Sequence, residues 1–185
     1  MLGLIDLKTG GTIELDGQPY LIVSNEHSKQ GRGGAVMRTK LKNLETGAVL
    51  ERTFKPSDKV EAARLDRRSV QYLYRDGEAL TFMDRASFEQ ASLQASDLGA
   101  VVSFLKEGES YDLLSFHGRA ISVDLPAKVV LTVTDTEPGE KGNTANAATK
   151  PATLETGYTL QVPLFIKIGD RLRVDTRTGQ YVERA

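Results

Sequence analysis

Short apolar runs separated by turn residues recur along the whole chain, and most of them alternate with polar positions at a period of two. In residues 35–43, small or apolar side chains share one face and cations the other: Ala35, Met37, Thr39 and Leu41 against Arg38, Lys40 and Lys42. This alternation predicts a strand with one buried face. Further strands are expected at 20–23, 48–54, 69–74, 79–83, 101–105, 120–123, 128–135, 158–162, 171–175 and 181–182, and the one plausible helical stretch is 84–98.

The expected strands fall into three groups, which predicts three β modules at 1–64, 65–126 and 127–185. Several strands with one apolar face within about 60 residues are typical of a small barrel. The third group is interrupted by residues 137–156, which are rich in Gly, Asn, Thr and Ala. A loop of that length is usually functional or disordered.

Composition excludes several kinds of site. The 185 residues contain no cysteine and two histidines. This excludes a disulfide framework, a thiol nucleophile and zinc sites built on cysteine or on three histidines, so no metal is expected. No apolar run approaches the ~18 residues of a membrane span. We therefore expect a cytoplasmic protein with no membrane partner.

The net charge of −1 hides an uneven distribution. The three modules carry 10 basic and 8 acidic, 6 and 10, and 8 and 7 residues, so their net charges are +2, −4 and +1. Between Glu26 and Glu45 there is no acid, but there are five cations: Lys29, Arg32, Arg38, Lys40 and Lys42. Because phosphate binding depends on local charge, this segment is a candidate RNA contact. The alternative is a solvated strand face.

The glycine-rich segment Gly31-Arg32-Gly33-Gly34 superficially resembles a phosphate-binding loop. A nucleotide-binding fingerprint opens a helix, however, and a strand is expected here. The segment instead predicts a tight hairpin tip with Arg32 exposed, where a guanidinium can stack on a base or bind phosphate. The alternative is an ordinary turn.

No convergent catalytic set is found in the sequence. Two hydrolase sets can be assembled on paper, but neither has a nucleophile-elbow context: Ser24, His27 and Asp16, or Ser115, His117 and Asp112. The aromatics Tyr72, Tyr74, Phe82 and Phe88 suit either a base-stacking platform or a core. We favour core positions for Phe82 and Phe88.

Motifs in all three modules resemble the bacterial elongation factor P family. The C-terminal motifs are 150–157, 162–165 and 174–181, and the middle module contributes 72–74 and 82–84. Residues 31–35 match the family's N-terminal loop tip and 39–44 the strand after it. The resemblance covers essentially the whole chain, in order and at matching length.

The resemblance implies three small β-barrels in an L-shaped, tRNA-like arrangement: an N-terminal KOW or Src-homology-3-like barrel and two OB-fold barrels. It implies a non-catalytic translation factor, without cofactor, that binds the 70S ribosome between the peptidyl and exit sites. Such a factor positions peptidyl-tRNA, stimulates peptide-bond formation and relieves stalling at consecutive prolines. The alternatives are an elongation-factor-P-like paralogue and a generic OB-fold RNA-binding protein.

The resemblance also assigns roles to residues. Arg32 points to the tRNA CCA end, supported by Gly31, Gly33 and Gly34, while Lys29, Arg38, Lys40 and Lys42 contact RNA backbone. In the third module, ribosome, exit-site codon or tRNA contacts are expected from Gly142, Asn143, Thr144, Lys150, Tyr181 and Arg184. A monomer is expected.

The chain departs from the family pattern at two places. Many members carry a modified lysine at the tip, where this chain has Arg32, which makes it a candidate for rhamnosylation by an arginine-modifying glycosyltransferase. Rhamnosylated members usually have proline before the first glycine, where this chain has Gln30. The usual Gly-Asp-Thr of the third module is Gly142-Asn143-Thr144 here, with one acid fewer.

Overall fold

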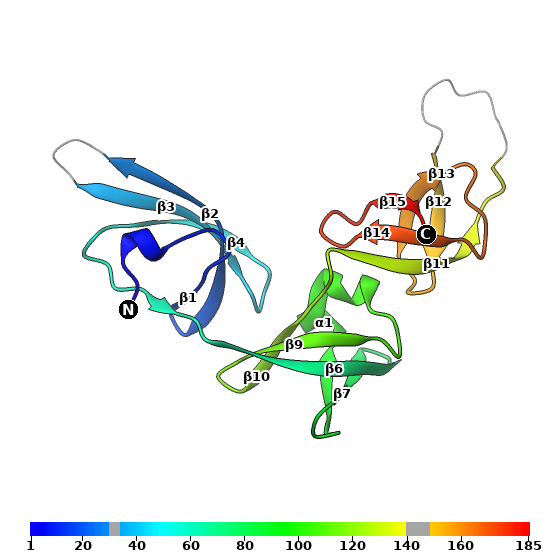
Figure 1. The fold of residues 1–185 in the computed structure, drawn as a ribbon, viewed down its shortest axis with the longest axis horizontal. Coiled ribbons are helices and arrows are strands. Elements are labelled where there is room, and N and C mark those ends of the chain that lie inside the picture. Colours follow the sequence, from blue (N-terminus) through cyan, green and yellow to red (C-terminus); the bar gives the residue numbers. More distant parts are fainter. Residues whose placement is uncertain (30–33, 140–148) are drawn as a thin grey trace. The chain divides into compact units, whose positions relative to one another are not determined.

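The computed structural model describes residues 1–29, 34–139 and 149–185, and its regular structure is almost entirely β (Figure 1). Within these residues, fifteen strands form three five-stranded sheets, called here the N-terminal, middle and C-terminal sheets. Each sheet is built from five consecutive strands, and pairings such as Ile13↔Ala62 and Lys128↔Asp175 join the beginning of a module to its end. The predicted all-β fold class is confirmed.

The N-terminal sheet has the strand order β4-β3-β2-β1-β5. It consists of β1 (Thr12–Leu15), β2 (Gln18–Lys29), β3 (Ala35–Asn43), β4 (Val49–Phe54) and β5 (Glu61–Ala62), preceded by the 3-10 helix η1 (Leu4–Asp6). The β1–β2 turn uses Asp16 and Gly17, both with positive φ (51° and 75°), as two-residue hairpins require. Its core contains Leu7, Ile13, Ile22, Met37, Leu41, Phe54 and Val60.

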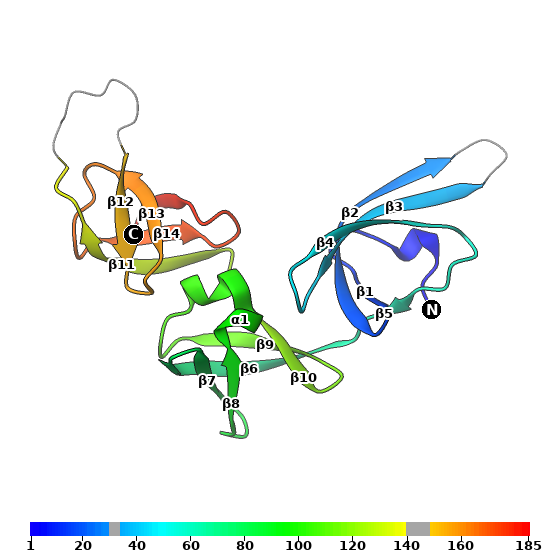
Figure 2. The same cartoon turned by 180° about the vertical axis from the view of Figure 1, so that it is seen from behind.

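The middle sheet has the order β10-β9-β6-β7-β8. Its strands are β6 (Leu65–Asp76), β7 (Ala79–Asp84), β8 (Gln90–Gln94), β9 (Ser110–Phe116) and β10 (Arg119–Asp124). Two short helices, α1 (Ala95–Leu98) and the 3-10 helix η3 (Gly99–Phe104), lie between β8 and β9 (Figure 2).

Two secondary-structure predictions for the middle module are wrong. Most of 84–98, predicted as helix, is a turn followed by β8, which pairs antiparallel with β7 from Ala79↔Gln94 to Met83↔Gln90. The turn begins at Asp84, whose Oδ1 accepts hydrogen bonds from the backbone amides of Ala86 and Ser87. Residues 101–105, predicted as a strand, largely belong to η3.

The aromatic residues of the middle module divide between core and surface. Phe82 is buried, as predicted, and its ring centroid lies 5.2 Å from that of buried Tyr72. Phe88 is 70% exposed, so its predicted core position is wrong. Phe88 has a positive φ of 61° in the turn after Asp84, which takes its side chain out of the strand alternation.

The C-terminal sheet has the order β13-β12-β11-β14-β15. Its strands are β11 (Lys128–Thr136), β12 (Thr149–Leu154), β13 (Thr159–Pro163), β14 (Arg171–Asp175) and β15 (Tyr181–Arg184). Residues 149–154 fall in the segment 137–156, which its Gly, Asn, Thr and Ala content predicts as a long loop, but they form β12. In the structure Pro151 pairs in register with Gln161 and its carbonyl accepts a hydrogen bond from the Thr136 hydroxyl.

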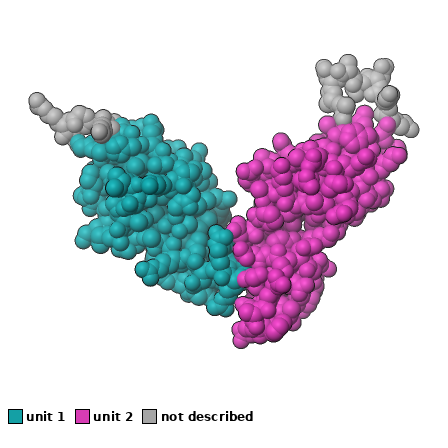
Figure 3. All heavy atoms as spheres, in the orientation of Figure 1, with its two compact units in different colours: residues 1–68, 113–122 teal, residues 69–112, 123–185 magenta. Residues whose placement is uncertain are grey.

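By its internal contacts the chain divides into two compact units, which Figure 3 colours separately. The first contains residues 1–68 and 113–122, and the second contains 69–112 and 123–185. The sheets themselves span 12–62, 65–124 and 128–184. The domain boundaries after 64 and 126 and the L-shaped arrangement stay predictions.

Candidate nucleic-acid interface

The long β2–β3 hairpin presents the cations of the N-terminal module. Backbone pairing runs from Tyr20↔Asn43 to Lys29↔Ala35, with one register shift between Ile22 and Ser24 (Figure 1). Met37, Thr39 and Leu41 of β3 are buried, while Arg38, Lys40 and Lys42 alternate with them on the exposed side. The predicted two-faced strand is therefore confirmed, and its buried face holds the cationic face outward.

Carboxylates on the neighbouring strands accompany these cations. Glu26 of β2 is the register partner of Arg38, and Glu51 of β4 is the partner of Lys40. Together with Arg52 and nearby polar side chains, these residues line a hollow of about 560 Å³. The hollow offers both signs of charge, so a phosphate here would meet acceptors as well as donors.

Glu51 and Arg52 on β4 were not among the predicted site residues, because only the cations of 35–43 indicated an interface. The Arg52 guanidinium carbon lies 5.6 Å from the centroid of the Phe54 ring, and the Arg52 carbonyl accepts a hydrogen bond from Thr39. The signal was present, since 48–54 was expected as the neighbouring strand. In the sheet, Glu51 is the cross-strand neighbour of Lys40, and Arg52 is that of Thr39.

The predicted tip lies largely outside the described residues. This applies to Gly31, Arg32 and Gly33, and to the side chain of Lys29. Gly34 is described, and its φ of +84° is one that L side chains rarely adopt. A glycine at this position therefore allows the chain to enter β3 directly from the tip.

In the C-terminal module, the predicted contacts Gly142, Asn143 and Thr144 also lie outside the described residues. Lys150 differs from the prediction, because it is 6% exposed and its ammonium donates a hydrogen bond to the carbonyl of Glu137. This bond joins the two described ends of the chain on either side of 140–148. Lys150 therefore acts inside the domain, and an exposed RNA contact from it is not what the structure shows.

Tyr181 and Arg184 lie on β15, at one edge of the C-terminal sheet. Tyr181 is partly buried against the C-terminal core, whereas Arg184 is exposed and its guanidinium carbon lies 5.9 Å from the Phe165 ring centroid. Phe165, which is 58% exposed, was not predicted as a site residue. An exposed aromatic beside a cation can stack on bases and contact phosphate.

The turn after β14 holds a carboxylate whose pKa is lowered. Hydrogen bonds from the Arg177 side chain, and then from its backbone amide, lower the pKa of Asp175 to about 2. Asp175 thus stays ionised at any physiological pH and holds the turn closed. Burial raises the pKa of Tyr72 and Tyr111 above the usual value of 10.0.

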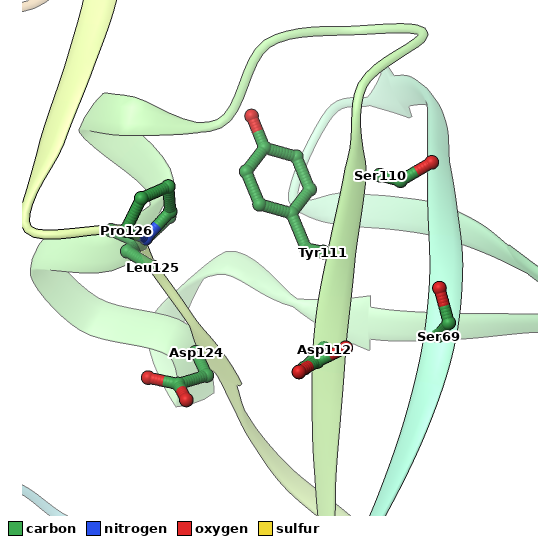
Figure 4. Close-up of a pocket in the computed structure, with 7 residues that line it drawn as sticks. All are labelled: Ser69, Ser110, Tyr111, Asp112, Asp124, Leu125 and Pro126. Atoms are coloured by element: carbon green, nitrogen blue, oxygen red, sulfur yellow. The ribbon is translucent and has the colours of Figure 1, made fainter.

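A second hollow, of about 330 Å³, lies among Ser69, Ser110, Tyr111, Asp112, Asp124, Leu125 and Pro126 (Figure 4). Its charged lining residues are both acidic, which opposes phosphate binding. The Tyr111 hydroxyl accepts a hydrogen bond from the backbone amide of Lys106. This hollow therefore offers no cationic side chain to a phosphate, whereas the hairpin does.

The described parts of the chain, residues 1–29, 34–139 and 149–185, give no support to two other kinds of site. They contain no cluster of three or more His, Cys, Asp or Glu residues that could hold a metal ion. None of their helices is long and apolar enough to cross a membrane.

Comparison with known proteins gives consistent matches along the chain. Residues 4–60 match the elongation factor P (EF-P) KOW-like domain, 65–123 the elongation factor P (EF-P) OB domain, and 129–184 the elongation factor P C-terminal domain. Elongation factor P of Moorella thermoacetica is 50% identical over 185 residues, and that of Pelotomaculum thermopropionicum 48% over 184. In both pairs the match covers 100% of each chain.

A solved structure supports the same assignment. Eukaryotic translation initiation factor 5A from Methanococcus jannaschii is 26% identical, with a TM-score of 0.56. The match covers 66% of this chain and 90% of that one. Because family matches extend over all three sheets and relatives are nearly half identical from end to end, the chain belongs to the elongation factor P family of translation factors.

Proposed function

We propose that this chain binds the 70S ribosome between the peptidyl and exit tRNA sites, positions peptidyl-tRNA and stimulates peptide-bond formation at consecutive prolines. The observation that carries the proposal is the full-length family match across all three sheets. The exposed cations of the β2–β3 hairpin give that function a physical basis.

Proline is a poor partner in peptide transfer because its ring fixes φ and restricts the residue before it. A factor that holds the end of peptidyl-tRNA in a reactive pose lowers the barrier by positioning alone. It needs no catalytic side chain of its own. The protein would therefore act in the cytoplasm as a non-catalytic monomer on the ribosome's own active site.

In this proposal Arg32 lies at the CCA end of peptidyl-tRNA, between the supporting glycines Gly31, Gly33 and Gly34. Lys29, Arg38, Lys40 and Lys42 bind RNA backbone phosphates. At the other end of the chain, residues 142–144 face the exit-site codon, and Arg184 contacts RNA with Tyr181 beside it. Lys150 supports this end by its hydrogen bond to Glu137.

The test is reconstituted translation of a message encoding consecutive prolines and a matched proline-free message. We expect the protein to accelerate synthesis only on the first message and Arg32→Ala to lose most of that acceleration. Lys59→Ala, which removes an exposed lysine outside the hairpin, should keep it. RNA binding without proline-dependent acceleration would contradict the proposal and favour a generic OB-fold RNA-binding protein.

Lys40→Ala tests the phosphate contacts separately. Removing one phosphate contact should weaken ribosome binding and reduce the slope of log affinity against log salt by about 1. Lys59→Ala is again the control. An unchanged slope would show that Lys40 is only a solvated strand residue.

We further propose that Arg32 is modified, with a glycosyltransferase that adds rhamnose as the partner. The mass of the Arg32 peptide from native protein decides this, because a modification of the side chain is not encoded in the gene. An increment of one deoxyhexose would support the proposal, and an unmodified peptide would contradict it.

A further inference from the structure

The turn between β12 and β13 touches the segment 99–106, although the two belong to different sheets. Thr156 Oγ1 donates a 2.6 Å hydrogen bond to the carbonyl of Ser103. The Lys106 ammonium lies 3.4 Å from Oε1 of Glu155. Both contacts lie within the second compact unit, between its middle-sheet and C-terminal-sheet parts.

An aromatic pair reinforces these polar contacts. Phe104, at the end of η3, is 4% exposed and belongs to the hydrophobic core of the C-terminal sheet. Its ring centroid lies 5.1 Å from that of Tyr158, with the planes tilted by 59°. A residue that precedes the C-terminal module in sequence is thus buried among that module's strands.

Two side chains of the turn also hold the C-terminal sheet. Oε1 of Glu155 accepts a 2.9 Å hydrogen bond from the amide of Thr132 on β11, so one carboxylate bridges β11 and Lys106. The Tyr158 hydroxyl donates a 3.0 Å hydrogen bond to the carbonyl of Gly179. A Cβ added to Gly179 would lie closer to the Tyr158 hydroxyl oxygen than Cβ atoms lie to other heavy atoms in real proteins.

These contacts explain a sequence feature that the proposed RNA contacts leave unused. Residues 154–157 and 175–179 are part of the motifs that mark the C-terminal module. The contacts described above are nevertheless made with other residues of the protein itself. Thr176, in the second motif, donates from its hydroxyl to the carbonyl of Pro126, in the connection between β10 and β11. Both motifs therefore bind segments that precede the C-terminal sheet.

We propose that these residues form a joint that fixes the C-terminal module on the middle module and so positions the two for their common RNA target. The joint is defined as Ser103, Phe104, Lys106, Glu155, Thr156, Tyr158 and Gly179. Its members are positioning residues, and they need no contact with RNA. This role rests on the proposed function, whereas the rigidity of the joint does not.

Rigidity is tested by a spin-label distance within the full chain. The protein has no cysteine, so Gln90→Cys on β8 and Gln161→Cys on β13, both exposed, give one label on each side of the joint. The parent should show one narrow distance distribution. The double variant Lys106→Met/Thr156→Val removes the ion pair and the hydrogen bond, and we expect the narrow peak to be lost.

The matched control is Thr153→Val/Lys167→Met. Among the described hydrogen bonds, the Thr153 hydroxyl pairs only with the Thr159 hydroxyl, within the β12–β13 hairpin. The Lys167 side chain is exposed. This variant should keep the parental peak. If the joint variant melts at a lower temperature than the parent, the isosteric variant Glu155→Gln is used in its place. Glu155→Gln keeps an acceptor for the Thr132 amide but loses the charge that pairs with Lys106.

The second readout is acceleration on the consecutive-proline message. We expect the joint variant to be about tenfold slower than the parent, because small misplacements far from the chemistry are amplified in positioned reactions. A parental distance distribution in the joint variant would overturn the joint. A broadened distribution with parental acceleration would overturn its positioning role. A parent that gives no acceleration would refute the proposed function and leave the distance experiment to decide rigidity alone.

Discussion

Replacing Gly179 by alanine adds a methyl group where the Tyr158 hydroxyl already lies. The φ of Gly179 is +72°, in the left-handed region. The new Cβ would come within 3.0 Å of the hydroxyl oxygen and lie 3.3 Å from Cζ of the same ring. Two costs therefore coincide at one residue, backbone strain and steric overlap with a ring that packs on Phe104.

The magnitude follows from these parts. An L residue in the left-handed region costs about 1 kcal/mol, overpacking about 1–3 kcal/mol, and the lost hydrogen bond about 1 kcal/mol. We expect Gly179→Ala to lower the free energy of unfolding of the C-terminal module by about 3–5 kcal/mol. Native-state hydrogen exchange on β12–β15 is the suitable assay, because a chain of several modules need not unfold in one step.

Gly157→Ala is the matched control. Gly157 has a similar φ of +84°, but no described atom lies within 4 Å of its Cβ position. It should therefore lose only the strain, about 1 kcal/mol. Tyr158→Phe/Gly179→Ala should recover about 2 kcal/mol over Gly179→Ala, because the clashing oxygen is gone. Equal losses for Gly157→Ala and Gly179→Ala would refute the reasoning.

Three further predictions concern other parts of the structure. Hydrogen bonds from Arg177 lower the pKa of Asp175 to about 2, from a usual 3.8. The contribution of Asp175 to stability is therefore full above pH 4 and is lost as pH falls toward 2. Asp175→Asn should make the free energy of unfolding less dependent on pH over that range, and a pH profile parallel to that of the parent protein would contradict this. Phe82→Ala should cost about 3–5 kcal/mol in urea unfolding, whereas Phe88→Ala should stay within about 0.5 kcal/mol; similar losses would show that burial does not separate them. Lys150→Ala should speed hydrogen exchange at the ends of β11 and β12 about tenfold, since the carbonyl it binds is left without its donor; unchanged exchange would show that the bond contributes nothing.

The alternation within single strands made much of the fold predictable. Residues 35–43 and 171–175 were expected as strands and are β3 and β14. Period-two patterns report directly on a buried face, whatever the partner strand is. The sheets could therefore be anticipated wherever one face is apolar.

Elements defined by their partners were not predictable. The β8 pattern is largely exposed and becomes a strand only because β7 lies beside it. Segment 101–105 is apolar enough for a strand, but Phe104 is buried in the core of the C-terminal sheet. Local sequence carries no information on such long-range contacts.

The candidate site shows the same division. The cations of β3 were visible in sequence, because they alternate with buried residues. The burial of Lys150 was not, because it depends on a carbonyl thirteen positions away. Glu26 and Glu51 became relevant only when register placed them beside Arg38 and Lys40.

The acids beside the hairpin cations change what the charge pattern means. A purely cationic face would bind any phosphate backbone, with an affinity set by charge and salt. Here Glu26 and Glu51 flank Arg38 and Lys40 in the sheet, so each phosphate must compete with a neighbouring carboxylate. Because each single phosphate is then attracted only weakly, the affinity for an RNA depends on how many contacts it makes at the same time. A target that presents its backbone in the matching shape would meet that condition, and this favours a structured tRNA over unstructured RNA.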